Sequence, residues 1–354
     1  MKKNRFNVLG VMSGTSLDGI DLCYSRFTYE DSWEFDIIKC TTIPYSNIWR
    51  EKLSSAIMAS QDSLSNLNKD YTSYLGEVIR KFIEDNQIND IDAVCSHGHT
   101  IFHEPNNEYT LQIGNLAELA SIVGNKVVCD FRVQDVKLGG QGAPLVPIGD
   151  KLLFHEHDFC INLGGFANVS FKENNKRIAF DICPVNIVLN YYVKKMNIMF
   201  DNKGEIAKSG KINQSLLEQL NDLEFYSTKP PKSLGLEWVM EHIFPLIEEY
   251  RLPTSDILRT FIEHVAIQIN RSTQYKNKAS ILFTGGGVFN TFLMERISAH
   301  SAHKVVVPDN DIIEFKEALI FGLLGVLKLR DEVNCLSSVT GAKRDHSSGN
   351  IFIP

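Results

Sequence analysis

One order of local patterns occurs twice in this chain and limits the folds that it can adopt. Each half begins with a short apolar stretch, a turn of small residues and two further stretches with strand-like patterns. The segments are residues 6–12, 13–19, 20–27 and 33–40 in the first half, and residues 159–163, 164–168, 169–172 and 177–181 in the second. Apolar, β-prone runs bounded by glycine and serine predict strands. A layout that recurs with weak sequence identity indicates two duplicated lobes.

Later segments alternate between strand-like and helix-like patterns, which favours an α/β architecture. These segments are residues 254–275, 280–283, 304–307 and 312–329. Because 354 residues exceed what one compact core usually holds, two domains are expected. The glycine- and proline-rich residues 139–147 predict a loop and a hinge region. We expect residues 1–135, joined by residues 330–354, to form lobe I and residues 136–329 to form lobe II, with a central cleft.

The composition restricts the partners and the compartment of the protein. The formal net charge is −7, so a general nucleic-acid binder, which needs a positive field, is not expected. No apolar run approaches the roughly 20 residues of a membrane-spanning helix, and the apolar residues 6–11 are too short for the core of a signal peptide. The seven cysteines are scattered without a CxxC pair, which favours free thiols in a reducing compartment. We therefore expect a cytoplasmic protein with no nucleic-acid or membrane partner.

Three turns rich in small residues follow predicted strands and are suited to bind phosphate. They contain Gly14, Thr15, Ser16, Leu17, Asp18 and Gly19 in the first turn, Gly164 and Gly165 in the second, and Gly285, Gly286, Gly287 and Asn290 in the third. Glycine lets the backbone approach an anion closely and direct N–H groups at it. A single turn such as the second is equally well explained as a plain β-hairpin turn. Three together favour a nucleotide-phosphate site, and the absence of a G-x-x-x-x-G-K-[ST] run excludes a Walker-type loop.

Several acidic residues stand where phosphoryl transfer would need them. Such a reaction uses a metal ion to neutralise phosphate charge and a base to prepare the nucleophile. Asp18 and Asp21 flank the first turn and are candidates to hold Mg²⁺, directly or through water, although Asp21 could instead be an exposed hairpin residue. Asp181 ends a predicted strand and is the candidate general base. Its alternative role is to cap the helix expected near Pro184.

Arg132 and a group of histidines are further candidates for polar contacts. Arg132 could bind a substrate carboxylate through two parallel hydrogen bonds, or it could form a structural ion pair with Asp130 or Asp135. Three histidines lie near one another in sequence: His97, His99 and His103. Their spacing is not that of a metalloenzyme motif, so we expect them to line a polar cleft or a surface loop rather than to bind zinc.

Taken together, these motifs resemble those of the anhydro-N-acetylmuramic acid kinases, members of the sugar kinase/Hsp70/actin superfamily. The matching segments occur in family order from residue 8 to about residue 342. They are GVMSGTSLDGID at 10–21, SHGHT at 96–100, TLQIG at 110–114, DFR at 130–132, GGQGAPLVP at 139–147, NLGGFAN at 162–168, PKS at 231–233 with Glu237, GGGVFN at 285–290, and EA at 317–318. The resemblance implies a two-lobed actin-like (ribonuclease H-like) ATPase fold and, by family precedent, a homodimer.

The resemblance also implies a reaction and a set of site residues. Family members use ATP and water to open the 1,6-anhydro ring of anhydro-N-acetylmuramic acid, giving N-acetylmuramic acid 6-phosphate in peptidoglycan recycling. Asp181 matches the catalytic aspartate that takes a proton from the attacking water. The predicted ATP contacts are Gly14, Thr15, Ser16, Leu17, Asp18, Gly19, Ile20 and Asp21, with Gly164, Gly165, Gly285, Gly286, Gly287 and Asn290. The predicted sugar contacts are His99, Thr100, Arg132 and Asn186.

The chain departs from the family pattern beside the catalytic aspartate. The family usually reads FDTGPGN, whereas residues 180–186 read FDICPVN. Ile182 replaces a hydroxyl residue, Cys183 and Val185 replace glycines, and His99 replaces the usual glutamine. Two alternatives to the family reaction follow. One is an ATP-dependent kinase for a related amino sugar with a reshaped pocket, and the other is a nucleotide-gated, actin-like binding protein.

Overall fold

The computed structural model describes residues 3–14 and 16–354, which form two compact units. Unit 1 comprises Met1–Leu153 and Phe315–Pro354, and unit 2 comprises Phe154–Glu314. These boundaries differ from the expected ones, which lay after residues 135 and 329. The helix α5 (Pro147–Leu153) belongs to unit 1 because it contacts strand β3 of that unit. The helix α13 (Asn310–Leu329) joins unit 1 from Phe315 onward because it packs against the same sheet.

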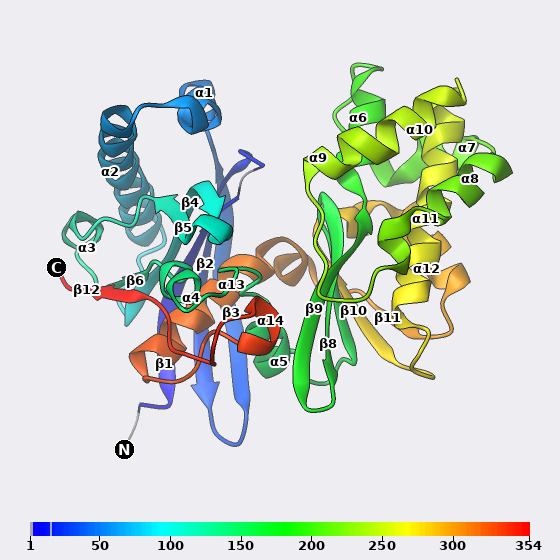
Figure 1. The fold of residues 1–354 in the computed structure, drawn as a ribbon. Helices are drawn as coiled ribbons and strands as arrows, with labels where there is room; N and C mark the ends of the chain where they lie inside the picture. The colour runs from blue at the N-terminus through cyan, green and yellow to red at the C-terminus, as the bar shows by residue number, and fades with distance from the viewer. Residues whose placement is uncertain (1–2, 15) are drawn as a thin grey trace. The chain divides into compact units, whose positions relative to one another are not determined.

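Unit 1 is built on one mixed sheet whose strand order is β12-β6-β4-β1-β2-β3, with β5 paired to β4 (Figure 1). Strands β1, β4 and β6 run parallel, while β2 and β3 extend the sheet as antiparallel hairpins. The strands are β1 (Arg5–Ser13), β2 (Gly19–Tyr29), β3 (Trp33–Pro44), β4 (Ala93–Glu104), β5 (Tyr109–Ile113), β6 (Val127–Cys129) and β12 (Asn350–Phe352). The other helices are α1 (Asn47–Ser55), α2 (Gln61–Asp85), α3 (Glu118–Val123), α4 (Val133–Lys137) and α14 (Ser337–Thr340).

The alternating side chains of β1 explain why helices cover both faces of this sheet. Leu9 and Val11 point into a core that also contains residues of α2, such as Tyr71. The opposite face is covered by α13, whose Gly322 lies against Val8. Successive residues of a strand face opposite sides of its sheet, so a strand buried on both sides is apolar throughout.

Unit 2 is built on a second mixed sheet with the order β11-β10-β7-β8-β9 (Figure 1). Strands β7, β10 and β11 run parallel, and β8 and β9 are antiparallel to their neighbours. The strands are β7 (Phe159–Leu163), β8 (Phe166–Glu173), β9 (Lys176–Pro184), β10 (Ser280–Thr284) and β11 (Lys304–Val306). The helices are α6 (Asn186–Lys194), α7 (Glu205–Ser209), α8 (Gln214–Asn221), α9 (Leu236–Trp238), α10 (Phe244–Glu249), α11 (Thr254–Thr273) and α12 (Thr291–His300).

Five strands of each sheet share one topology. In each unit the third, second and first strands are antiparallel neighbours, and the first strand pairs in parallel with a fourth, which pairs in parallel with a fifth. The expected α/β class with a duplicated strand–turn–strand–strand layout is therefore confirmed. This order is the ribonuclease H-like arrangement that the resemblance implied.

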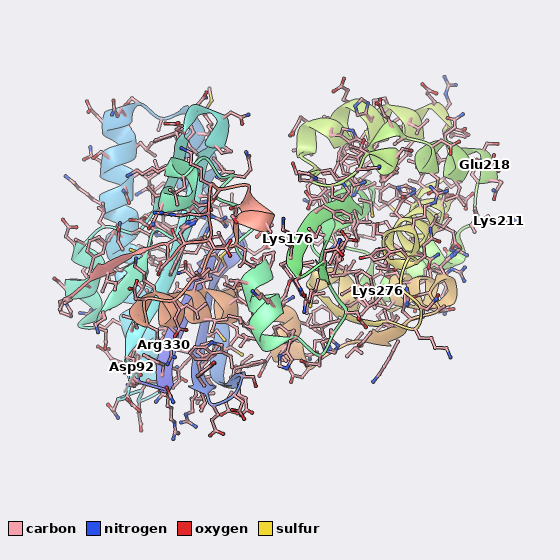
Figure 2. The ribbon with its side chains drawn as sticks, turned by 60° about the horizontal axis from the view of Figure 1, so that its bottom comes forward. Asp92, Lys176, Lys211, Glu218, Lys276 and Arg330 are labelled. Carbon is pink, nitrogen blue, oxygen red and sulfur yellow. The ribbon has the colours of Figure 1, made fainter. Side chains whose placement is uncertain are left out.

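Polar contacts at the start of the parallel strands of unit 2 fix their relative positions. Asp158 precedes β7, and its carboxylate accepts from the Ser280 N–H over 2.9 Å. Its other oxygen lies 3.2 Å from Nζ of Lys276, a residue that follows α11 and is labelled in Figure 2. The hydrogen bond from the Ser280 N–H lowers the pKa of Asp158 more than the ion pair does. Asp158 therefore links β7, β10 and the segment after α11.

Within the described parts of the chain, residues 3–14 and 16–354, none of the helices has both the length and the apolar character needed to cross a membrane.

Candidate functional site

The predicted site residues fall into two groups, one in each unit, and each group is described by itself. The group in unit 1 contains the first turn with Ile20 and Asp21, and also His99, Thr100 and Arg132. The group in unit 2 contains Asp181, Asn186 and the two other glycine turns. Each group lies at one end of its sheet, close to the turns that follow the first strand.

The turn between β1 and β2 forms the first predicted phosphate loop. It joins Ser13 to Gly19. Among its described residues, the Leu17 N–H donates to the Gly14 carbonyl and the Tyr45 N–H donates to the Asp18 carbonyl, both over 3.3 Å. Leu17 has a positive φ of 59°. Gly19 packs so closely on the Ile43 backbone that a Cβ there would lie 2.5 Å from the Ile43 carbonyl oxygen. Apart from Thr15, the only N–H of residues 14–18 with a backbone partner is that of Leu17, so the others are available to an anion.

The side chains of this turn differ in what they can contact. Ser16 and Asp18 are exposed and could reach a ligand directly. Ile20 is fully buried in the core of unit 1, and Leu17 packs against that core. Ile20 can therefore contact a ligand only through its backbone, whereas the half-buried Leu17 keeps part of its side chain accessible. Thr15 lies outside the described residues.

A buried hydrogen-bond network holds Ser13, the residue at which the turn between β1 and β2 begins. Ser13 Oγ lies 2.8 Å from His99 Nδ1 and 2.6 Å from the Tyr45 hydroxyl, which in turn is bonded to the Tyr71 hydroxyl. Burial lowers the pKa of His99 to about 4 and raises the pKa of Tyr45 to about 12. All members are therefore uncharged near neutral pH. No local sequence pattern indicated the two tyrosines, because they lie far from Ser13 along the chain.

Arg132 is held by two hydrogen bonds in unit 1. Its Nε donates to His97 Nε2 over 2.9 Å, and its Nη1 donates to the Gly142 carbonyl over 2.7 Å. His97 Nδ1 lies 2.8 Å from the Gly98 carbonyl, so Nδ1 carries the proton and Nε2 accepts. No hydrogen bond engages Nη2 within residues 3–14 and 16–354. Arg132 is thus oriented by neutral partners and keeps donors for a ligand.

The two ion pairs considered for Arg132 are not formed. Asp130 accepts instead from Asn350 over 3.0 Å, and Asp135 accepts from the Gly142 N–H over 2.7 Å. Thr100, another predicted sugar contact, is half-buried on β4, where its hydroxyl lies 3.4 Å from Gln112 Nε2.

Two carboxylates of unit 1 are further candidates to hold a metal ion. Asp21 is half-buried rather than exposed, and its Oδ1 accepts from the Thr42 hydroxyl over 2.6 Å. Glu317, on α13, interacts electrostatically with both Asp21 and Arg132. The sequence comparison had included Glu317 in a matching segment without giving it a role. Carboxylate oxygens of this kind fit Mg²⁺, with Asp18 available from the turn above.

The two glycine turns of unit 2 pack against each other. Gly164 and Gly165 form the hairpin turn between β7 and β8, as the plainer interpretation predicted. Gly285 has a φ of 83°, and a Cβ there would lie 3.0 Å from the Leu163 carbonyl carbon. A Cβ on Gly287 would lie 2.8 Å from Leu163 Cβ. Only glycine fits at these two positions, so the second and third turns form one compact backbone surface.

Asn186 and Asn290 have structural bonds beside these turns. Asn186, the first residue of α6, donates from its side chain to the Leu163 carbonyl over 3.2 Å. The side-chain oxygen of Asn290 accepts from the Leu293 N–H over 2.9 Å and caps α12. The third turn therefore continues as a 3₁₀ turn over Gly286–Phe289 before the helix begins.

Asp181 lies within β9 and is half-buried. Its Oδ2 accepts from the Leu234 N–H over 2.8 Å, and its own N–H donates to the Lys232 carbonyl over 3.1 Å. Burial raises the pKa of Asp181, and the Leu234 N–H opposes this rise. Val185 occupies the N-cap position of α6, so the alternative role of Asp181 as a helix cap is wrong. A carboxylate held through one oxygen in this way is arranged to accept a proton.

Ile182 and Cys183, two of the unusual residues after Asp181, lie at a β-bulge. Asn168 of β8 pairs with Asp181, while the residue before it pairs with Cys183, so Ile182 is an extra residue on β9. The side chains of Ile182, Cys183 and Val185 are all buried in the core of unit 2. Their side chains therefore contribute to the packing of unit 2 rather than to an exposed surface beside Asp181. Bulges of this kind reorient a side chain and are frequent beside active sites.

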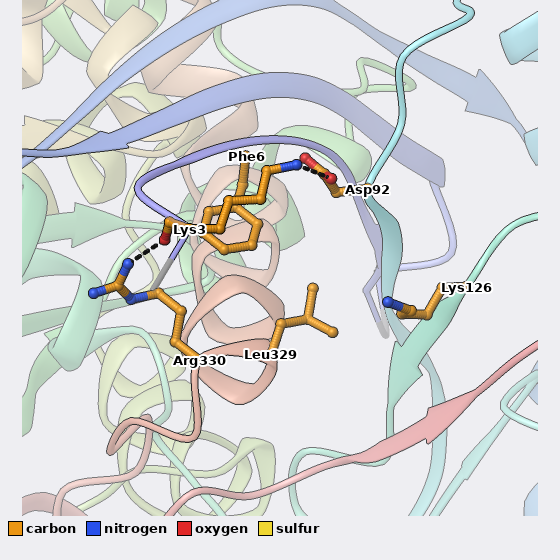
Figure 3. Close-up of a pocket in the computed structure, with 6 residues that line it drawn as sticks. All are labelled: Lys3, Phe6, Asp92, Lys126, Leu329 and Arg330. Atoms are coloured by element: carbon orange, nitrogen blue, oxygen red, sulfur yellow. Dashed lines mark hydrogen bonds and ion pairs between the residues drawn. The ribbon is translucent and has the colours of Figure 1, made fainter. Parts of the chain in front are cut away.

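A further pocket in unit 1 contains none of the predicted site residues (Figure 3). Its lining consists of Lys3, Phe6, Asp92, Lys126, Leu329 and Arg330. Lys3 pairs with Asp92, and Arg330 donates to the Lys3 carbonyl and pairs with Glu332 over 2.9 Å. These two cations are bound by their own neighbours, so the pocket is not a candidate active site.

Comparison with known proteins identifies the family of the chain. The family model described as anhydro-N-acetylmuramic acid kinase matches residues 6–354. The anhydro-N-acetylmuramic acid kinase of Mannheimia succiniciproducens is 33% identical over 97% of this chain and 98% of its own length. That of Francisella tularensis subsp. novicida is 34% identical over 95% of both chains. Among solved structures, an activator of 2-hydroxyisocaproyl-CoA dehydratase from Clostridium difficile aligns with 92% of this chain and 95% of its own at 13% identity and a TM-score of 0.46. By its sequence, the chain belongs to the anhydro-N-acetylmuramic acid kinase family.

Proposed function

We propose that this chain uses ATP and water to convert 1,6-anhydro-N-acetylmuramic acid into N-acetylmuramic acid 6-phosphate, with Asp181 as the general base. Membership of the kinase family supports the reaction class. The observation that supports the residue assignment is the placement of Asp181, whose Oδ2 is held by the Leu234 N–H and whose pKa is raised by burial. A carboxylate with a raised pKa is a stronger base than an exposed one while it remains ionised.

In the proposed reaction, Asp181 accepts a proton from the attacking water. The water oxygen forms a bond to the anomeric carbon C1, and the bond between C1 and O6 breaks. O6 takes the γ-phosphoryl group of ATP, and ADP leaves. Oδ1 of Asp181 is the oxygen to receive the proton, because no hydrogen bond engages it in the described part of the chain, whereas Oδ2 accepts from Leu234. Positioning and charge stabilisation then account for most of the phosphoryl-transfer step.

ATP is proposed to bind through the glycine turns of both units. The turn at Gly14–Asp21 would offer backbone N–H groups and the Ser16 hydroxyl. The joined turns of unit 2, with Gly164, Gly165 and Gly285 to Gly287, would offer backbone alone. Asp18, Asp21 and Glu317 have the carboxylate oxygens that Mg²⁺ prefers. When bound there, Mg²⁺ would neutralise charge on the phosphates.

The sugar is proposed to lie on the side of Arg132 and His99. Arg132 is fixed through Nε and Nη1, and its remaining donors suit the carboxylate of the lactyl group of the substrate. His99 is neutral and buried behind Ser13, so it would act by holding the turn. Thr100 and Asn186 are the remaining proposed sugar contacts.

We also propose that the enzyme is a cytoplasmic homodimer. The seven free thiols support the cytoplasmic location, and the family precedent supports the homodimer.

The test is ADP release from the purified chain with ATP and Mg²⁺, with and without the anhydro sugar, in water labelled with ¹⁸O. The proposal predicts strong stimulation by the sugar and a 6-phosphorylated product with one ¹⁸O at C1. Stimulation only by other amino sugars would support the related-sugar alternative, and ATP binding without any stimulation would support the binding-protein alternative. Asp181→Asn is the matched variant, since an amide preserves the size of the side chain.

A further inference from the structure

Three residues able to bind a metal ion converge in the interior of unit 1. Cys335 and His346 form an isolated antiparallel bridge, in which each N–H donates to the carbonyl of the other residue over 3.1 and 3.2 Å. Directly opposed residues project their side chains to the same side of such a pair. Asp135, in α4, completes the group. The exposed fractions are 0% for Asp135, 2% for Cys335 and 6% for His346, so none of the three is a surface group.

The distances within this cluster are close to those of a metal site. One ligand atom from each residue lies within 4.8 Å of those from the other two. His346 Nε2 is 3.6 Å from Asp135 Oδ1. Nitrogen, oxygen and sulfur ligands of a tetrahedral Zn²⁺ are separated by about 3.3–3.6 Å, given the usual bond lengths. Among the residues that the structure describes, this is the only such group of three histidine, cysteine and acidic residues.

The imidazole of His346 gives an independent indication that a cation belongs here. Its Nδ1 lies 3.1 Å from the Arg344 carbonyl, which accepts, so Nδ1 carries the proton. The lone pair of Nε2 then points toward Asp135, and this buried atom has no hydrogen-bond partner. Two acceptors that face each other in a protein interior are unfavourable unless a cation or a proton lies between them. A protonated Nε2 would need Asp135 within hydrogen-bond distance, and 3.6 Å is too long.

We propose that Asp135, Cys335 and His346 bind one Zn²⁺ ion, with water as the fourth ligand. Sulfur, nitrogen and carboxylate oxygen together select zinc over Mg²⁺, which prefers oxygen alone. The surrounding hydrogen bonds are those expected around such ligands. The Arg344 carbonyl fixes the His346 tautomer, and Asp135 accepts from the Thr340 hydroxyl over 2.7 Å. Burial and the nearby Asp135 raise the pKa of Cys335, so zinc would displace a proton from a neutral thiol.

The proposed zinc would connect the C-terminal segment to the loop that holds Arg132. Arg132 stands at the start of α4, the helix that carries Asp135. The Gln141 N–H donates to the Thr340 carbonyl over 2.7 Å, which already links the two segments. A metal ion bound to residues from both would stiffen this connection. The role of the ion is therefore structural and separate from the magnesium proposed for phosphoryl transfer.

The first experiment is metal analysis of the full, tag-free chain purified without chelators. We expect about one zinc per chain, since three buried ligands fix a single ion. After removal of the metal, titration with Co²⁺ should give a near-ultraviolet thiolate-to-cobalt charge-transfer band that saturates at one equivalent. Zn²⁺ should abolish this band.

Two variants test the ligands. Cys335→Ser should lose the cobalt band and weaken Zn²⁺ binding by at least about 100-fold, the upper range for loss of a supporting contact. His346→Gln should weaken Zn²⁺ binding similarly while keeping the thiolate, and it stands in if the cysteine variant does not fold. Cys129→Ser is the matched control, because Cys129 is a buried thiol of the same unit outside the cluster.

The proposal is overturned if the chain as purified holds no zinc and the metal-free protein shows no cobalt–thiolate band. It is also overturned if Cys335→Ser and His346→Gln bind zinc as tightly as the parent chain and Cys129→Ser. A melting temperature that rises with Zn²⁺ in the parent and in the control, but not in Cys335→Ser, supports it, because a ligand that binds only the folded chain stabilises that chain.

Discussion

The two units share a strand order but differ in the turn that follows the first strand. In unit 1 the turn is long and is supported by side chains, namely the buried network of Ser13, His99 and Tyr45. In unit 2 the turn is short and is supported by backbone packing of Gly285 and Gly287 on Leu163. The two units therefore share a strand order but support the turn after their first strand in different ways.

The third strand of each sheet differs as well. In unit 1, Thr42 of β3 pairs with Asp21 and donates to its carboxylate. In unit 2, β9 carries a bulge beside Asp181, which pairs with Asn168. Shared topology thus does not determine which unit supplies a base. That depends on the residue at one register position and on the local irregularity next to it.

The largest expected effect is a loss of turnover on substitution of Asp181, which lies in β9, the third strand of unit 2. Asp181→Asn should lower kcat by about 10²–10⁴-fold, the contribution of a general base. The amide can still accept from the Leu234 N–H, so the melting temperature and ATP affinity should change little. Steady-state ADP release and ATP binding by calorimetry measure the two quantities.

Thr42→Val in unit 1 is the control for this prediction. It removes the hydrogen bond to Asp21 and leaves Asp181 intact. We expect a loss of turnover far smaller than that of Asp181→Asn. Equal losses in the two variants would contradict the assignment of the base to unit 2.

The next effect concerns the glycine turns. Gly285→Ala should destabilise the chain by about 1–3 kcal/mol or more, because φ is 83° and a Cβ would contact Leu163 at 3.0 Å. Gly14→Ala should change stability by less than about 0.5 kcal/mol, because the nearest atom would be 3.5 Å from its Cβ. Urea unfolding midpoints compare the two directly. If both substitutions were tolerated alike, the turn of unit 2 would not depend on backbone packing.

The pH dependence of stability tests the network of unit 1. Burial lowers the pKa of His99 to about 4, whereas an unfolded histidine titrates near 6.5. The unfolded chain therefore binds more protons between these values, and the stability present above pH 6.5 is lost as the pH falls toward 4. For His99 alone the loss at pH 5 is on the order of 2 kcal/mol. His264 of unit 2, whose pKa burial lowers to about 3, acts in the same direction.

His99→Gln separates the contribution of His99 from the others. The variant should lose less stability than the parent when urea unfolding is compared at pH 7 and pH 5. His155→Gln, a change at an exposed histidine of unit 2, is the control and should follow the parent. An unchanged pH dependence in His99→Gln would show that this residue is not buried in a neutral state.

Local patterns predicted the strands and the three turns because strand periodicity and small residues are properties of adjacent positions. They were less informative for helices. The helix α2 begins at Gln61, and its first ten residues, 61–70, are mostly polar and so have little helical periodicity of apolar side chains. The helix α5 begins at Pro147, at the end of a stretch expected to be a loop, since proline suits a first helical turn.

The sequence predicted the motifs of the candidate site but not the contacts that orient their side chains. The contacts that orient the predicted residues come from distant segments: Tyr45 on Ser13, Leu234 on Asp181, and His97 on Arg132. The pairing of Cys335 with His346 opposite Asp135 has the same origin. No local pattern carries such information, because it depends on which segments the fold brings together.

The smallest expected effect concerns Asn290, which could cap α12 alone or also contribute to ATP binding. Its side chain caps α12 in unit 2, as Ser46 caps α1 in unit 1, where the Trp49 N–H lies 3.3 Å from the Ser46 hydroxyl. Replacing either residue by alanine should lower the free energy of unfolding by about 1 kcal/mol, the usual value of such a cap. Only Asn290→Ala should also weaken ATP binding, because α12 follows the glycine turn proposed to hold the nucleotide. If ATP affinity were the same in both variants, Asn290 would serve the helix alone, and the nucleotide contacts of unit 2 would be limited to backbone groups.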